Sequence, residues 1–186
     1  PNIALSDFIA PKETHKTDYM GAFCVAIYGE QELANWYKDK EDDYNAIMAQ
    51  ATAERFEEEM AEYLHKQIRI KHWGYDSGET LSNDDLIQES YKGIRPAPGY
   101  PACPDHLEKD TIWELLKVEE NIGVTLTESL AMWPAAAVSG YYFANKEAKY
   151  FGLGKITDDQ VTDYATRKGI AKETARKWLH PNLAEE

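Results

Sequence analysis

Short continuous apolar runs and stretches with helical apolar spacing follow one another along the chain, and this contrast predicts its elements. Residues 19–28 form an apolar run rich in aromatic and β-branched side chains that ends at Gly29, which predicts a buried strand. A short helix is expected over residues 31–37. The charged stretch that follows supplies acidic residues suited to the start of a second helix.

The longest predicted element is an amphipathic helix from Asp43 to about Trp73, a segment without proline or glycine. Its apolar residues recur at steps of three and four, which predicts that one helix face lies in the core. The residues expected on that face are Tyr44, Ile47, Met48, Ala51, Phe56, Met60, Tyr63, Leu64 and Ile68. The acidic run at residues 57–59 is expected on the solvated side, and Gly74 ends the helix.

The second half of the chain predicts shorter helices and one hairpin. The helices are expected over residues 84–91, 104–120, 157–168 and 172–179, each with an N-cap, proline or glycine signal at an end. Two apolar stretches, residues 138–144 and 149–156, are separated by four residues, which predicts a β-hairpin. Strands separated by unequal helical stretches indicate one α+β domain with a mostly antiparallel sheet, a long amphipathic helix and several shorter helices.

Composition narrows the class of protein. The 186 residues fit a single domain, and an apolar share of 43% is enough for a buried core. A net charge of −13 repels phosphate backbones and anionic lipid surfaces, so binding to nucleic acid or to a membrane surface is disfavoured. The sequence contains neither an apolar window of about eighteen residues nor a secretory leader, which predicts a cytoplasmic protein. Because the chain opens without methionine, we expect that part of a longer polypeptide is missing.

Few residue patterns typical of catalysis or metal binding occur. Cys24 and Cys103 lack metal-ligand spacing and fit reduced thiols, and the five histidines show no zinc-like spacing. No GxGxxG or Walker loop is present. The carboxylates Glu54, Glu57, Glu58, Glu59 and Glu62 could form an acid/base pair, but they are most simply a solvated helix face. Glu54 and Glu58 nevertheless share a face, where one of them could meet a cationic ligand group or a partner residue.

The segment IRPAPGYPACPDH, residues 94–106, combines one arginine with four prolines and a single glycine. The prolines restrict their own φ and the residues before them, so the loop is stiff before any ligand binds. Gly99 permits a positive φ or a close approach of the backbone to a ligand. Arg95 has a planar fork suited to a carboxylate, and Tyr100 adds a ring and a hydroxyl. The sequence therefore predicts a fixed loop that holds Arg95 against a small anionic ligand.

Two other interpretations of this loop stay open. Residues 95–101 also fit R-x-x-P-x-x-P, the pattern of ligands for aromatic grooves, although such ligands usually lie in polar disordered tracts. A purely structural connection with a surface arginine is the second. The aromatic residues of the predicted hairpin could stack on a flat heterocycle, but aromatic side chains in strands more often form core contacts.

Four segments, GIRPAPGYPACPDH, LTESLAMWP, VSGYYFANKEAKYF and RKWLHPNL, stand in an order that resembles the C-terminal activation domain of cobalamin-dependent methionine synthase. That family carries an Arg-x-x-x-Gly-Tyr pattern, and the resemblance extends over essentially all of residues 1–186. It implies binding of S-adenosylmethionine, with Arg95 on the ligand's carboxylate. The other implied ligand contacts are Pro96, Ala97, Gly99, Tyr100, Tyr150, Phe151 and Glu58. Glu30 and Glu54 match acidic positions that face the cobalamin-carrying module.

The chemistry that the resemblance implies is a repair reaction. Reductive methylation converts inert cob(II)alamin to methylcobalamin, with an electron from a flavodoxin-type or flavoprotein reductase and the methyl group from S-adenosylmethionine. Because the sulfonium methyl is already activated, the resemblance implies no catalytic acid, base or nucleophile in this domain. Cobalamin is presented by a separate module of the parent enzyme, and zinc belongs only to the absent homocysteine module.

The family domain is longer on its N-terminal side, where it supplies an acidic residue for the ligand's amino group. The isolated chain is therefore expected to bind the ligand weakly. Because it also lacks the homocysteine, folate and cobalamin modules, it is expected to support methionine biosynthesis as part of a methyltransferase without making methionine itself. Two rival hypotheses remain. One is a non-catalytic interaction domain that docks a partner through the proline-rich loop or the acidic helix, and the other is a free-standing methyltransferase that acts on another corrinoid protein.

Overall fold

The computed structural model describes residues 3–184. The strands are β1 (Met20–Ala26), β2 (Thr125–Leu126), β3 (Met132–Trp133) and β4 (Ala137–Phe143). The α-helices are α1 (Glu30–Lys38), α2 (Asp43–Gln67), α3 (Asn83–Ile87), α4 (Glu108–Leu116), α5 (Val118–Ile122), α6 (Asp158–Lys168) and α7 (Lys172–Trp178). Short 3-10 helices lie at Leu5–Phe8, Lys12–Thr14 and His180–Asn182, and a π-helical turn at Ile68–His72 continues α2.

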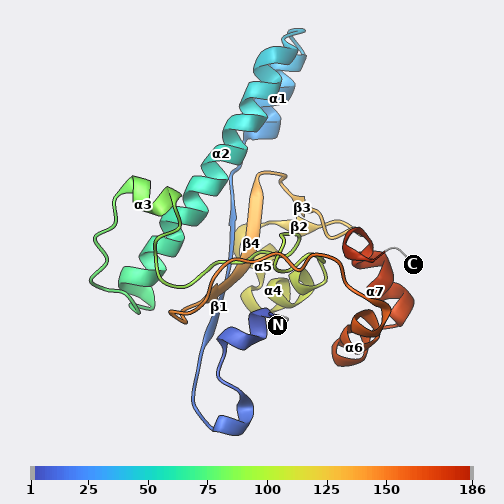
Figure 1. Ribbon diagram of the computed structural model, residues 1–186. Helices are drawn as coiled ribbons and strands as arrows, with labels where there is room; N and C mark the ends of the chain where they lie inside the picture. Colours follow the sequence, from blue (N-terminus) through green and yellow to red (C-terminus); the bar gives the residue numbers. More distant parts are fainter. Residues whose placement is uncertain (1–2, 185–186) are drawn as a thin grey trace.

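A two-stranded antiparallel sheet of β1 and β4 forms the centre of the molecule (Figure 1). In its register Phe23 lies opposite Gly140 and Val25 opposite Val138. Because side chains along a strand alternate between the two faces, Phe23 and Val25 pack toward α2, whereas Cys24 packs on the opposite face with Ile112 of α4. With β2 and β3 as a second antiparallel pair, the structure confirms the predicted α+β class.

The helix α2 lies along α1 and extends beyond the sheet (Figure 1), but its buried face is not the predicted one. The buried residues of α2 are Ala46, Ala53, Glu57, Ala61 and His65. Large apolar side chains expected in the core, such as Tyr44, Ile47 and Phe56, are exposed. Small alanines let the backbone of α2 come close to its neighbours, so packing distance rather than side-chain size selects the buried face. Glu57, predicted to face solvent, is turned inward.

The predicted hairpin of residues 138–144 and 149–156 is wrong. β4 pairs with β1 instead, and residues 149–155 form an irregular segment. Ile156 forms an isolated bridge with Leu183. The other edge of β4 is taken by the start of the proline-rich loop, because Ile94 N donates to Phe143 O at 3.0 Å. Apolar spacing in the sequence identifies a strand but does not identify its partner.

Two predicted helices are shorter or divided in the structure. The helix expected to reach residue 91 ends at Ile87, and Glu89 just after it has a φ of 54°. The helix expected over residues 104–120 is split into α4 and α5 at Lys117, whose φ is 47°. A left-handed residue cannot continue a right-handed helix, so the chain changes direction at both positions.

The C-terminal helices α6 and α7 confirm the predicted helices in this region. They pack on each other through Val161, Ala165 and Ala175, in a cluster separate from the central core. Tyr164 of α6 donates to the buried carboxylate of Asp105 at 2.9 Å, which ties this helix pair to the end of the proline-rich loop. Within residues 3–184, none of the helices combines the length and apolar character needed to cross a membrane.

Gly140 marks the closest approach of β4 to the loop. A Cβ at this position would lie 2.5 Å from the Pro96 carbonyl oxygen and 2.9 Å from a ring carbon of Phe23. We therefore expect Gly140→Ala to destabilise the fold by about 1–3 kcal/mol, measured by urea denaturation. Gly78→Ala is the control, since no heavy atom lies within 4 Å of the position that its methyl group would take. Equal stability of the two variants would contradict this close contact.

Candidate ligand-binding site

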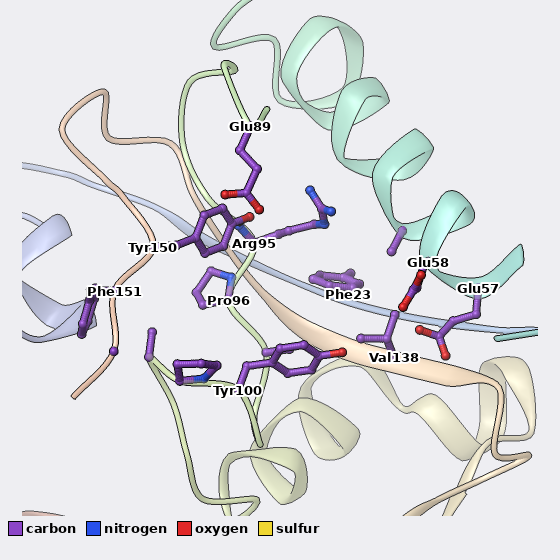
Figure 2. A pocket seen from close by; sticks show the side chains of 15 residues that line it. Phe23, Glu57, Glu58, Glu89, Arg95, Pro96, Tyr100, Val138, Tyr150 and Phe151 are labelled. Carbon is purple, nitrogen blue, oxygen red and sulfur yellow. The ribbon is translucent and has the colours of Figure 1, made fainter. Parts of the chain in front are cut away.

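A cavity of about 660 Å³ opens between α2, the central sheet and the proline-rich loop (Figure 2). Its α2 side is lined by Glu57, Glu58 and Ala61, and its sheet side by Phe23 and Val138. The remaining wall consists of Glu89, Arg95, Pro96, Ala97, Tyr100, Pro101, Ala102, Tyr150, Phe151 and Gly152. Segments from five separate parts of the sequence therefore meet at one cavity.

Backbone hydrogen bonds at and beside Arg95 fix the position of this residue. The residues on either side of it are hydrogen-bonded to the backbone of β4. Ile94 N donates to Phe143 O at 3.0 Å, and Pro96 O accepts from Tyr141 N at 2.9 Å. The amide of Arg95 itself donates to the Tyr150 hydroxyl at 3.0 Å. These hydrogen bonds make residues 94–96 an added edge of the sheet, so the direction of the Arg95 side chain follows from the register of β4.

The rest of the loop closes into tight turns. Gly99 N donates to Cys103 O at 2.7 Å, and Gly99 has the positive φ, 96°, that the sequence made possible. A Cβ on Gly99 would lie 2.4 Å from the His106 ring, so the glycine packs against that ring and does not itself line the cavity. Tyr100 beside it does. Pro98 is buried, so the loop cannot enter the groove of another protein as a polyproline ligand without leaving the core.

The guanidinium of Arg95 is occupied on one nitrogen only. Nη1 pairs with Glu62 Oε2 at 2.7 Å, donates to the Tyr91 hydroxyl at 2.7 Å and lies 3.4 Å from His65 Nδ1. Among residues 3–184, no hydrogen-bond acceptor meets Nε or Nη2. These two donors form the edge of the fork that grips a carboxylate with parallel hydrogen bonds.

A second arginine, Arg69, forms a bidentate pair with a carboxylate of the protein itself. Arg69, fully buried in the π-helical turn, binds Glu79 through Nε at 2.5 Å and Nη2 at 3.0 Å. Glu62 lies between the two arginines, 3.6 Å from Arg69 Nη2 and 2.7 Å from Arg95 Nη1. Two carboxylates thus balance two guanidinium groups, which is the condition under which buried charges are tolerated.

Burial keeps His65, Tyr91 and Tyr142 neutral beside this cluster, because it lowers the pKa of the imidazole and raises the pKa of both phenols. Burial, followed by the charges of Arg69 and Arg95, lowers the pKa of His65 to about 2. Its neutral ring stacks on Tyr142, with ring centroids 5.2 Å apart, and can accept a hydrogen bond from Arg95. The hydroxyls of Tyr91 and Tyr150 lie 3.2 Å apart, so the predicted ligand contact Tyr150 belongs to the same network.

The wall opposite the arginine is acidic. Glu57 is 9% exposed, and burial together with the charges of Glu58 and Glu54 raises its pKa from the usual 4.5 to about 7. Glu58 is exposed and pairs with Arg55 at 2.5 Å. Figure 2 shows the Glu89 carboxylate directed toward the Tyr150 ring. The cavity therefore has the Arg95 guanidinium and Glu89 on the side of Tyr150, and the carboxylates of Glu57 and Glu58 on the side of α2.

The structure gathers most of the predicted ligand contacts in this one cavity. Those that line it are Glu58, Arg95, Pro96, Ala97, Tyr100, Tyr150 and Phe151. Glu30 and Glu54 lie elsewhere: Glu30 is buried beside a hollow between α1 and α2, and Glu54 is exposed on α2.

The residues behind Arg95 were not predicted from the sequence. Glu62, His65 and Arg69 stand three and four positions apart, so they share one face of α2. This polar stripe was the available signal, but the apolar residues on the other face of the helix obscured it.

The fold is an α+β domain whose cavity is lined by an arginine with one edge of its guanidinium open. The family model described as vitamin B12 dependent methionine synthase, activation domain, matches residues 1–169. A crystal structure of the MetH reactivation domain bound to AdoHcy is 54% identical over 98% of this chain, with a TM-score of 0.94. The chain therefore belongs to the family of vitamin B12-dependent methionine synthase activation domains. It covers 56% of the length of that solved chain.

The buried ion pair behind the site generates a stability prediction. Glu79→Ala leaves Arg69 charged, buried and without its bidentate partner, and we expect a loss of about 3–5 kcal/mol in urea denaturation. Glu59→Ala, which removes an exposed carboxylate from α2, serves as the control and should change stability little. Similar stabilities of the two variants would mean that Arg69 finds another partner.

The buried carboxylate of Glu57 generates a pH prediction. Because its pKa in the fold is above 4.5, its favourable contribution is complete below that pH and is lost as the pH rises through about 7. Glu57→Gln should therefore remove part of the fall in melting temperature between about pH 5 and pH 8, by roughly 2–4 °C. Glu59→Gln should keep the wild-type profile. Parallel profiles for all three proteins would contradict a raised pKa at Glu57.

Proposed function

We propose that the cavity binds S-adenosylmethionine and that the chain is the reactivation module of a cobalamin-dependent methionine synthase. The observation that carries this proposal is the unpaired Nε–Nη2 edge of Arg95 in the wall of the cavity. The ligand has a carboxylate for this edge, an aromatic base for the tyrosine and phenylalanine rings, and a sulfonium cation for the acidic wall. The AdoHcy in the similar reactivation domain supports the same assignment.

The cavity has the size and lining expected of a site for such a ligand. About 660 Å³ falls within the range of small-molecule pockets, and most of the lining is apolar or aromatic. In the proposed complex, Arg95 holds the carboxylate, and Tyr150 and Phe151 contact the adenosine and amino-acid parts. The remaining proposed contacts are Pro96, Ala97 and Tyr100 in the loop wall and Glu58 on the acidic side. Gly99 contributes the tight turn beside Tyr100 and does not itself line the cavity.

The task of these residues is to bind and orient a methyl donor that is already activated, so no acid, base or nucleophile of this chain takes part. Cobalamin, carried by a separate module, would supply the nucleophile for the methyl group once a flavodoxin-type or flavoprotein reductase has supplied an electron. We assign the contact with that module to Glu30 and Glu54. The free thiols of Cys24 and Cys103 support a cytoplasmic location.

The proposal predicts a loss of affinity that depends on the ligand's carboxylate. Arg95→Ala removes two charged hydrogen bonds and should weaken S-adenosylmethionine binding roughly 100-fold or more in calorimetry. Binding of 5′-methylthioadenosine, which has no carboxylate, should change little.

Arg167→Ala is the matched control, because Arg167 is an exposed arginine of α6 outside the cavity. It should bind both ligands like the wild-type protein. Equal affinity of wild-type and Arg95→Ala proteins for S-adenosylmethionine would refute the clamp. Absence of wild-type binding at millimolar ligand would refute the function and favour a protein-docking role.

A further inference from the structure

We infer that the C-terminal helix pair of α6 and α7 holds the outer part of the proline-rich loop, residues 98–108, in the position that the ligand needs. Tyr164 and Lys168 of α6 are the positioning residues, because their side chains join this part of the loop to the helix pair. The inference rests on the proposed function, since it concerns a ligand held in the same cavity. It adds a second support to the site, distinct from the one that holds Arg95.

The two parts of the loop are held by different elements. The inner part, residues 94–97, is hydrogen-bonded to β4 and packs against Gly140. The outer part forms hydrogen bonds within the loop, from Tyr100 N to Ala97 O at 3.1 Å and from Cys103 N to Tyr100 O at 2.9 Å. These bonds fix the shape of the turn, but they do not fasten it to the body of the protein.

The outer part of the loop is a thin wall between two cavities. Ala102 lines the ligand cavity and also a second cavity of about 620 Å³, which lies between the loop, residues 3–7 and α6. Asp105 and Tyr164 line the second cavity as well. A segment with open space on both sides has fewer packing contacts to resist displacement than one inside a close-packed core. Its position therefore depends on the few contacts that do hold it.

The first of these contacts joins α6 to Asp105. The Tyr164 hydroxyl donates to Asp105 Oδ2 at 2.9 Å, and Asp105 Oδ1 accepts from Leu107 N at 2.9 Å. Burial, followed by the charge of Asp105, raises the pKa of Tyr164, so the hydroxyl keeps its proton and remains the donor. Asp105 is only 4% exposed. Loss of the hydroxyl would leave a buried carboxylate with one partner fewer, so the contact is costly to break.

The second contact joins α6 to the start of α4 and, through it, to the sheet. Lys168 Nζ forms an ion pair with Glu108 Oε1, and Glu108 Oε2 accepts from the Tyr141 hydroxyl at 3.2 Å. Both members of the ion pair are partly buried, so solvent screens them less than it screens an exposed surface pair. Because Tyr141 N also donates to Pro96 O at 2.9 Å, Glu108 links the helix pair to both parts of the loop.

A ring contact links α7 to the turn itself. The rings of Trp178 and His106 pack edge-on, with centroids 6.1 Å apart. The His106 ring in turn packs against Gly99, and its Nδ1 has no hydrogen-bond partner within residues 3–184. Burial, followed by the charge of Lys109, lowers the pKa of His106, so the neutral ring acts as a packing surface. Because Gly99 is next to Tyr100, a displacement of α7 would reach the cavity wall through this ring.

The helix pair is a packing unit of its own. Val161, Ala165 and Ala175 form a hydrophobic cluster separate from the central core. The contacts with the loop described above are polar or ring contacts, which are directional, rather than a shared apolar core. Loss of one of them is therefore expected to loosen the loop without unfolding the sheet.

The two supports act on different walls of the cavity. In Figure 2 the Arg95 guanidinium lies above Phe23, and the Tyr100 ring lies below it. Arg95 is fixed by hydrogen bonds to the backbone of β4 beside it and by its ion pair with Glu62, whereas Tyr100 depends on the outer part of the loop. Loosening the helix pair should weaken the contacts of Tyr100 with a ligand and leave the grip of Arg95 on a carboxylate intact.

Calorimetry of the full chain with S-adenosylmethionine and 5′-methylthioadenosine tests the inference. Tyr164→Phe and Lys168→Ala should each weaken the binding of both ligands by the same factor, roughly 3- to 10-fold, because neither lost contact involves the open edge of Arg95. The ratio of the two affinities should therefore keep its wild-type value. Arg95→Ala should change that ratio, since it weakens the binding of S-adenosylmethionine alone.

Hydrogen exchange of the ligand-free protein gives a readout that a general loss of stability would not produce. In both variants of α6, the amides of Gly99 and Cys103, which are hydrogen-bonded within the turn, should exchange faster. The amides of Tyr141 and Phe143, which are hydrogen-bonded to the inner part of the loop, should keep their wild-type rates. Equal acceleration at all four amides would overturn the inference, because it would mean that the variants only destabilise the fold.

A conservative variant and two exposed ones complete the comparison. Lys168→Arg keeps a cation opposite Glu108 and should restore most of the affinity for both ligands. Lys177→Ala removes an exposed charge from α7, and Tyr44→Phe removes an exposed hydroxyl from α2. Both of these controls should behave like the wild-type protein.

Unchanged affinities in Tyr164→Phe and Lys168→Ala would overturn the inference and leave the proposed function intact. A selective loss of S-adenosylmethionine binding would do the same, because that pattern belongs to the grip on the carboxylate. If the wild-type protein binds neither ligand at millimolar concentration, the proposed function and the inference both fail. Equal weakening of both ligands, with faster exchange confined to the turn, supports the inference.

Discussion

The side chain of Arg95 is tied to Glu62 through one nitrogen, and its backbone neighbours are hydrogen-bonded to β4. These two constraints come from different elements, the sheet and α2, and they meet at a single guanidinium. Their joint effect is to leave the Nε–Nη2 edge without a partner among the residues that the structure describes. This placement puts Arg95 in the wall of the cavity, and the hydrogen bond from its amide to the Tyr150 hydroxyl joins the loop to a second lining residue.

The buried charged groups at and behind the cavity fall into two kinds, those with a partner of opposite charge and one without such a partner among residues 3–184. Arg69, Glu79, Glu62 and Arg95 form a balanced set in which each charge meets its opposite. Such a set holds geometry without demanding a ligand. Glu57 lies outside it, buried but facing an open cavity. The contrast separates a paired framework that sets the position of Arg95 from a carboxyl group at the cavity wall whose pKa is raised by burial.

Local signals predicted most of the elements because their physical causes are local. The capping box at Ser82 begins α3, and Gly169 ends α6, in each case through hydrogen bonds within a few residues. The hairpin failed for the opposite reason: the partner of β4 is β1, and strand pairing depends on which distant segment completes the ladder. The prediction of the buried face of α2 was wrong because close approach of the helix through its alanines outweighed the burial of larger side chains.

By itself, the sequence predicted most of the helices, the stiffness of the proline-rich loop, Arg95 as a candidate ligand contact and the family resemblance. All of these are properties of residues near one another along the chain or of motif order. Only the tertiary structure decided that Glu62 occupies one side of the arginine fork and that Glu57 faces the cavity while Glu59 faces solvent. The physical reason is that burial and ion pairing depend on which surfaces meet. A carboxylate in an acidic run has the same sequence neighbours whether its helix turns it toward water or toward a ligand.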